Sequence, residues 1–116
     1  MALALNNYKT ITKVASTSPV GIYTAPTGYS GIVLLAQVAN VGSETYTVTV
    51  SHERSSTGTA VTTEIVKEFP VPANDTASLV SGKLVLEPSD VIVLSANNAS
   101  NLKCIVSVLE TLNWYV

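Results

Sequence analysis

Hydrophobic and polar residues alternate along most of this chain with a period of two, which is typical of β-strands. Within residues 44–53, one face of the predicted strand carries the large side chains Tyr46, Val48, Val50 and His52. Within residues 102–110, one face carries Leu102, Cys104, Val106 and Val108. The opposite face of that second segment includes Ile105 and Leu109, so we expect it to be covered rather than fully solvated.

Nine segments with strand patterning follow one another, separated by turn residues such as Pro, Gly, Asn and Asp. They span residues 8–15, 20–24, 31–40, 44–53, 60–69, 77–80, 83–86, 91–96 and 102–110. The nearly continuous apolar run at 31–40 predicts a strand in the middle of a sheet. We interpret 83–86 and 91–94 as the two arms of a hairpin. No segment predicts a helix longer than one turn.

The spacing of these segments predicts an all-β fold class. We expect a single-domain β-sandwich over residues 1–116, jelly-roll-like, with about eight or nine short antiparallel strands and no long helix; a small barrel is the alternative. The length of 116 residues suits one domain, and we find no linker and no convincing repeat.

Composition narrows the possible functions. The chain is 47% hydrophobic and 12% charged, which excludes a disordered chain. A net charge of −2 offers no basic stripe for nucleic acid. The apolar N-terminal stretch stops at Leu5, and no apolar run approaches the length of a membrane span. We therefore expect no nucleic-acid partner, no membrane partner and no signal peptide, and synthesis in a cytoplasm.

Candidate chemistry is sparse. His52 and Cys104 form the only nucleophilic pair that the chain offers, and Cys104 lies mid-strand on an apolar face. The acidic residues are scattered; Asp75 and Asp90 could contribute to a calcium site, but no cluster surrounds them. We predict no catalytic, cofactor-binding or metal-binding residues, and no enzyme.

The two ends of the chain are apolar. An N-terminal arm at 1–7 and a C-terminal tail at 111–116 predict subunit contacts through Leu3, Leu5, Trp114, Tyr115 and Val116. The alternative is that the tail folds back over its own sandwich.

Several motifs resemble a known family. They are Leu-Asn-Asn-Tyr-Lys-Thr-Ile-Thr-Lys at 5–13, Tyr-Thr-Ala-Pro-Thr-Gly at 23–28, Tyr-Thr-Val-Thr-Val-Ser-His at 46–52, Phe-Pro-Val-Pro-Ala-Asn-Asp-Thr at 69–76, Leu-Val-Leu-Glu-Pro-Ser-Asp at 84–90 and Val-Leu-Glu-Thr-Leu-Asn at 108–113. The chain resembles the small all-β virion structural proteins of tailed bacteriophages, notably those of cyanobacterial myoviruses. The residues at 114–116 extend past the family's closing motif.

The resemblance implies a non-enzymatic virion protein, either a decoration subunit on the capsid exterior or a part of the tail, neck or baseplate. Its partners would be other virion proteins and copies of itself. The alternative is a receptor- or carbohydrate-binding module of a virion appendage. That alternative would use polar loops at 54–59 and 97–101 and exposed aromatic residues, for which the candidates are Tyr23, Tyr29, Trp114 and Tyr115.

Overall fold

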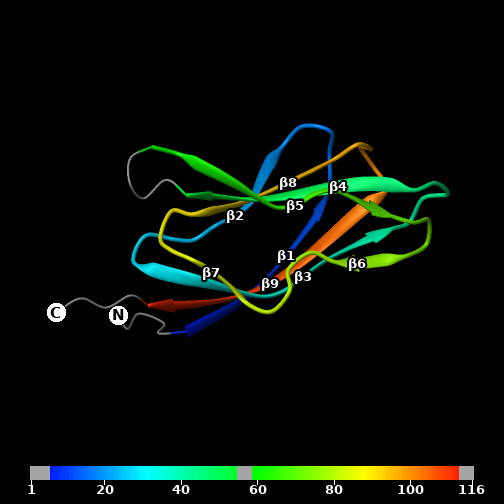
Figure 1. Ribbon diagram of the computed structural model, residues 1–116. Coiled ribbons are helices and arrows are strands. Elements are labelled where there is room, and N and C mark those ends of the chain that lie inside the picture. The colour runs from blue at the N-terminus through cyan, green and yellow to red at the C-terminus, as the bar shows by residue number, and fades with distance from the viewer. Residues whose placement is uncertain (1–5, 55–58, 113–116) are drawn as a thin grey trace.

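Two antiparallel β-sheets face each other in the computed structural model, which describes residues 6–54 and 59–112 (Figure 1). One sheet has the order β1-β9-β3-β6, with β7 also paired to β3, and the other has the order β2-β8-β4-β5. The strands are β1 (Asn6–Val14), β2 (Val20–Thr24), β3 (Tyr29–Asn40), β4 (Tyr46–Arg54), β5 (Val61–Val71), β6 (Thr76–Ser78), β7 (Leu84–Leu86), β8 (Val91–Ala96) and β9 (Leu102–Leu112). Across the described residues, no helix is long and apolar enough to span a membrane.

The strand order is that of a jelly roll. Strands β6 and β7 pair with the same edge of β3, so they act as one interrupted strand. Between them the Leu79 N–H donates to the carbonyl of Ala36 at 2.8 Å, which continues the pairing. Each sheet then has four strands, and the chain passes from one sheet to the other at every connection except the β4–β5 hairpin, as in a jelly roll. The predicted sandwich is confirmed.

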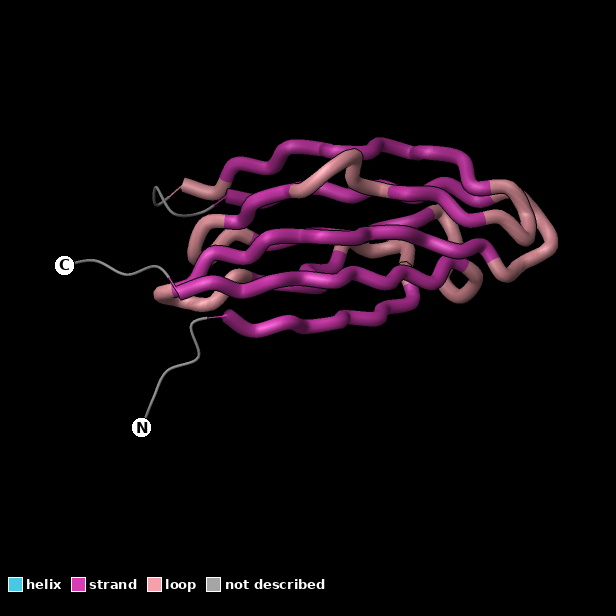
Figure 2. The backbone as a smooth tube through the Cα atoms, turned by 90° about the horizontal axis from the view of Figure 1, so that it is seen from below, coloured by secondary structure: helices cyan, strands magenta, loops and turns pink. Residues whose placement is uncertain are grey.

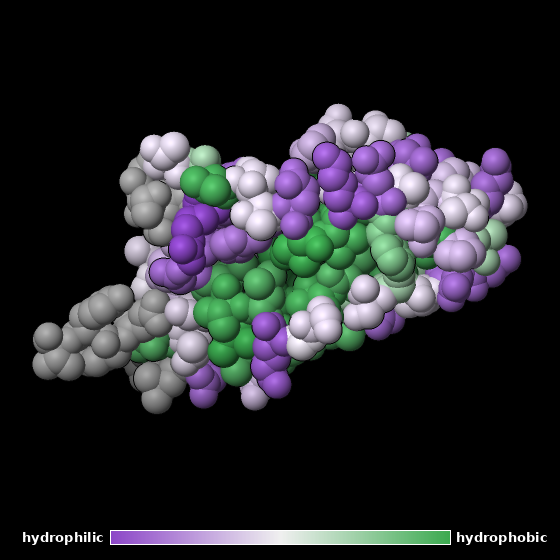
Figure 3. Space-filling view, in the orientation of Figure 1, coloured by the Kyte–Doolittle hydropathy of each residue, from purple (hydrophilic) through white to green (hydrophobic). Residues whose placement is uncertain are grey.

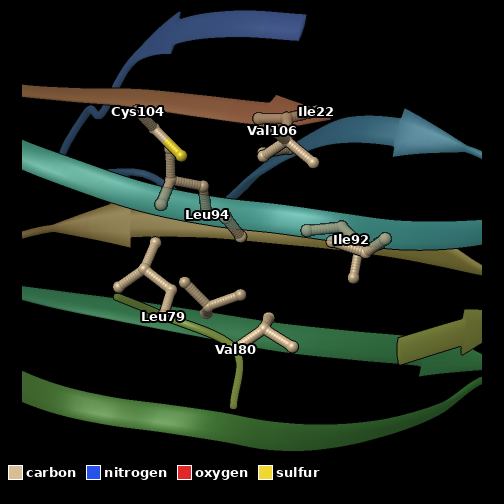
Figure 4. A pocket seen from close by; sticks show the side chains of 10 residues that line it. Ile22, Leu79, Val80, Ile92, Leu94, Cys104 and Val106 are labelled. Carbon is tan, nitrogen blue, oxygen red and sulfur yellow. The ribbon is translucent and has the colours of Figure 1, made fainter. Parts of the chain in front are cut away.

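Alternating valine and leucine side chains from both sheets fill the core. Val38, Val48 and Leu102 have no exposed surface. A residual cavity of about 10 Å³ lies between the sheets, and Figure 4 shows Cys104 and Leu94 pointing into it. Only apolar side chains and the Cys104 thiol line it, so it is a packing defect at the lower size limit for one water. The core has no room for a substrate.

The strand predictions were accurate and one pairing was wrong. The segment at 31–40 does lie inside its sheet, between β9 on one side and β6 and β7 on the other. The hairpin expected between 83–86 and 91–94 does not form, because β7 pairs with β3 whereas β8 pairs with β2 and β4 in the other sheet. A turn that connects a strand of one sheet to a strand of the other has the same local sequence pattern as a turn that joins two paired strands.

Strand β5 forms one edge of its sheet and is irregular. It continues through Pro70, whose missing N–H is tolerated on an edge strand. Glu68 has a φ of 49°, and its N–H donates to the Thr49 hydroxyl at 3.0 Å. The register shifts twice along β4 and β5, so the free edge of β5 is bent.

Strands β1 and β9 bring the two ends of the described chain together. Asn6 pairs with Thr111, so β1 begins where β9 ends, at one end of the sheet (Figure 2). The described chain therefore begins and ends on neighbouring strands.

We expect Leu86→Ala to lower the free energy of unfolding by roughly 2–5 kcal/mol, because Leu86 is fully buried and the surrounding sheets cannot collapse into the space. Val61→Ala, at a valine that is 54% exposed, should change it by less than about 0.5 kcal/mol. Urea denaturation of both variants checks this; equal losses would contradict the assigned core.

Candidate interaction surface

The outer face of the β1-β9-β3-β7 sheet carries a row of apolar side chains that crosses all four strands. The backbone register pairs Tyr8 with Leu109, Leu109 with Ile32, and Ile32 with Val85. Residues opposite one another in a sheet point to the same face, so these four form the apolar row. Tyr8 is 74% exposed and Val85 is 57% exposed, so both ends of the row lie open.

A β-bulge in β3 adds apolar surface beside this row. The register with β9 shifts between Val33 and Leu35. Val33 is buried, whereas Leu34 and Leu35, which follow it, are both exposed. A regular strand would turn one of these two leucines inward, so the bulge places an extra leucine in solvent. We define the apolar face by its members, which are Tyr8, Ile32, Leu34, Leu35, Val85, Ile105 and Leu109.

Charge is almost absent from this face. Among the described strand residues that the register places on the outer face of this sheet, Lys103, near the start of β9, is the single charged side chain. The outer face of the other sheet differs, because Thr47, Thr49 and Glu53 of β4 surround two half-buried valines of β8. The outer face of the β1-β9-β3-β7 sheet is therefore the more apolar of the two. It is the better suited of the two to contact another protein.

Apolar surface continues around the β7 edge of the sandwich. Figure 3 shows it gathered over β7 and the adjoining β3, and between the two sheets, with polar residues around it. The half-buried residues Ile65, Val66, Val80 and Leu84 pack against the core. Val85 thus lies where the outer face meets this side.

A buried carboxylate positions Tyr8. Glu110, which is 3% exposed, accepts hydrogen bonds from the Tyr23 hydroxyl at 2.6 Å and from the Asn7 side-chain amide at 3.2 Å. The Lys9 ammonium lies 3.4 Å from the same carboxylate. Because Asn7 and Lys9 both turn inward to Glu110, Tyr8 between them must point outward, onto the apolar face.

The ionisation of this cluster follows from its contacts. Burial would raise the pKa of Glu110, but the hydrogen bonds from Tyr23 and Asn7 and the charge of Lys9 outweigh it and hold the pKa below its usual value. Burial, together with the hydrogen bond to Glu110, raises the pKa of Tyr23. Gly31 makes room for that tyrosine, because a Cβ there would lie 2.9 Å from the Tyr23 hydroxyl oxygen.

A second polar cluster holds the turn between β7 and β8. Asp90 is fully buried, and its Oδ2 lies 3.0 Å from His52 Nε2 and accepts the Glu87 backbone N–H at 3.1 Å. Arg54 pairs with the Glu87 carboxylate and has its Nε 3.9 Å from Asp90 Oδ2. These contacts fasten the turn to the end of β4. No group of three or more metal-ligating side chains occurs in residues 6–54 and 59–112.

His52 and Cys104, which the sequence analysis considered as a nucleophilic pair, lie in different sheets. His52 lies on β4 and binds Asp90, whereas Cys104 lies on β9 in the other sheet, its thiol among apolar side chains. Burial raises the pKa of Cys104 to about 11, which disfavours a nucleophilic thiolate. The expectation that Tyr23 is an exposed aromatic is wrong, because it is 7% exposed and spans the core to reach Glu110.

The predicted contact residues Leu3, Leu5, Trp114, Tyr115 and Val116 lie outside the described residues. The apolar row itself was missed by sequence reasoning, since its members come from four separate segments. Its one signal was the apolar character of Ile105 and Leu109 on the second face of β9, which we expected to be covered. Both residues are half-buried and lie on the outer face of the sheet.

Comparisons with known proteins find solved structures with a similar fold. A chain of the acidic stable capsid structure of Helicobacter pylori bacteriophage KHP30 aligns with a TM-score of 0.54 at 15% identity, covering 97% of this chain and 92% of that one. A chain of the Bacillus endospore appendages, which form disulfide-linked pili, aligns with a TM-score of 0.54 at 16% identity, covering 97% and 96%. No protein-family model and no curated protein matches.

We expect Glu110→Gln to lower stability at neutral pH by about 1–3 kcal/mol, the usual contribution of hydrogen bonds to a charged group. Since the folded pKa of Glu110 is lowered, its contribution is present above the ordinary value of 4.5 and is lost as the pH falls through the folded value. Urea unfolding from about pH 6 to about pH 3 should therefore show a flatter pH dependence in the variant.

Glu64→Gln, on the exposed part of β5, is the matched control. An unchanged slope in Glu110→Gln would contradict the cluster.

We expect the Cys104 thiol to resist a soluble disulfide reagent in the folded protein and to react at once in denaturant, because it is buried with a pKa near 11. The raised pKa also predicts stability that is full below the ordinary value of 9.0 and declines as the pH rises through about 11. Rapid labelling of the native protein would show that the thiol is accessible.

Proposed function

We propose that this chain is a non-enzymatic structural subunit of a phage virion that acts through protein–protein contacts. The observation that carries the proposal is the apolar face, because soluble monomers seldom expose a contiguous apolar surface of this kind. The jelly roll is a fold used by viral capsid proteins, and a chain of a phage capsid structure shares the fold over 97% of this chain.

Within the virion we propose an accessory or decoration subunit, on the capsid exterior or in the tail, neck or baseplate. Its partners are other virion proteins and copies of itself, with no nucleic acid and no membrane. We propose that the apolar residues near both ends of the sequence, Leu3, Leu5, Trp114, Tyr115 and Val116, add contacts to neighbours. Weak contacts repeated over a symmetric particle add up through effective concentration.

The contacts proposed here are non-covalent. A linear series of disulfide-linked subunits needs at least two cysteines in each subunit. These 116 residues contain one cysteine, Cys104, which is buried. The chain therefore shares the fold of the spore-appendage subunit without the means to form that kind of linkage from these residues.

The alternative, a receptor- or carbohydrate-binding module, has less support. It depended on exposed aromatic side chains, and the burial of Tyr23 removes one of the candidates. The polar loop residues at 97–101 include Asn98, whose side chain accepts hydrogen bonds from the backbone of Ser100 and Asn101. That amide oxygen thus stabilises the turn itself.

The test is the composition of purified particles of the virus that encodes the chain. Quantitative mass spectrometry should find the protein in many copies per particle. Recombinant full-length chain should bind particles that lack it, and a chain truncated after Asn113 should fold equally well but bind more weakly. Absence from particles would overturn the structural role, and equal binding by the truncated chain would overturn the role of Trp114, Tyr115 and Val116.

A further inference from the structure

The apolar face is exposed at both ends, and Lys103 is the one charged strand residue described on this side of the sheet. We propose that the apolar face packs against the same face of a second copy of this chain, giving a two-fold symmetric dimer, an inference that rests on the proposed structural function. The apolar row supplies the centre of the contact, and the two leucines at the β3 bulge extend it. Face-to-face packing of two sheets is the arrangement that already forms the sandwich core within one chain.

The size of the face argues for an occupant as large as a second sheet. Strands β1, β9 and β3 have 9, 11 and 12 residues, and β6 and β7 together form an interrupted fourth strand beside β3. At about 4.8 Å between strands and about 3.3 Å per residue, this whole outer face covers on the order of 600 Å². A stable interface uses about 800 Å² per partner, so a face-to-face dimer comes close to this size. A peptide or a terminal segment would cover a strip one or two strands wide and leave the rest of the row in water.

The distribution of charge favours the same face of a second copy as the partner. It also favours one orientation of the two copies. A partner with clustered charge would meet little opposite charge on this face, because Lys103 is the single charged residue among the described strand residues that point outward from the sheet. The apolar row runs across the strands, so a two-fold axis along the row lays row upon row. This axis makes the strands of the two copies antiparallel and puts their Lys103 residues at opposite ends of the interface.

The same symmetry makes a specific contact. Rotation about an axis along the row leaves position along the row unchanged, so Val85 faces Val85 of the second copy, and Tyr8 faces Tyr8. An isologous contact of this kind is self-complementary and closes as a dimer. A charge placed at Val85 would meet its own copy across a desolvated contact, whereas the same charge elsewhere would remain in water.

The experiment compares Val85→Asp with Val61→Asp by analytical ultracentrifugation. The two valines are 57% and 54% exposed and both lie on edge strands, so they form a matched pair. Wild type should dimerise as concentration rises from about 1 µM to about 1 mM. Val85→Asp should weaken the dimer by at least about tenfold, and Val61→Asp should leave it unchanged. Circular dichroism and thermal unfolding establish that both variants are folded.

A second measurement tests the contact directly. Val85→Cys should form a disulfide-linked dimer on mild oxidation, and Val61→Cys should not; the native thiol of Cys104 is buried. A wild-type chain that stays monomeric throughout the concentration range would overturn the dimer, as would equal effects of the two aspartates or failure of Val85→Cys to cross-link. None of these outcomes affects the particle measurement, which counts copies whatever covers the face, so failure of the dimer and failure of the structural role are distinguishable.

Discussion

The buried carboxylate of Glu110 is the interaction on which the shape of this molecule depends. Strand β1 has little hydrophobic attachment, because Ile11 is the one residue among Asn6–Val14 that is half-buried and the others are exposed. Beyond the hydrogen-bond ladder to β9, its anchors are Asn7 and Lys9 on Glu110. Tyr23 reaches the same carboxylate from the opposite sheet, so one ionised group connects strands β1, β2 and β9.

The contacts of Glu110 offset the cost of burying its charge in a mostly apolar interior. A buried carboxylate is costly unless its lone pairs are satisfied, and here two hydrogen bonds and an ammonium satisfy them. An apolar replacement would leave the Tyr23 hydroxyl buried without its acceptor. Asp90 fastens the β7–β8 turn through Oδ2, which contacts His52 and the Glu87 N–H, whereas its buried Oδ1 has no hydrogen-bond partner among the described residues.

Strand positions could be predicted from the sequence because they depend on local alternation. The segments at 20–24 and 91–96 coincide with β2 and β8. Pairing depends on distant parts of the chain, which is why β7 and β8 were wrongly joined as a hairpin. The apolar row could not be predicted from the sequence for the same reason. Its members Tyr8, Ile32, Val85 and Leu109 come together only through the register of four strands. The burial of Tyr23 depends on the absence of a side chain at Gly31, across the core.

The irregular edge of β5 affects whether a further strand can add to this sheet. A straight, fully donating edge strand would invite further chains to add on, and crowded copies would then grow into fibrils. Pro70 lacks a donor, and the left-handed backbone at Glu68 bends the strand and directs its N–H to Thr49. A proline and a bent backbone disfavour the addition of a further strand along this edge, and so work against fibril formation through it.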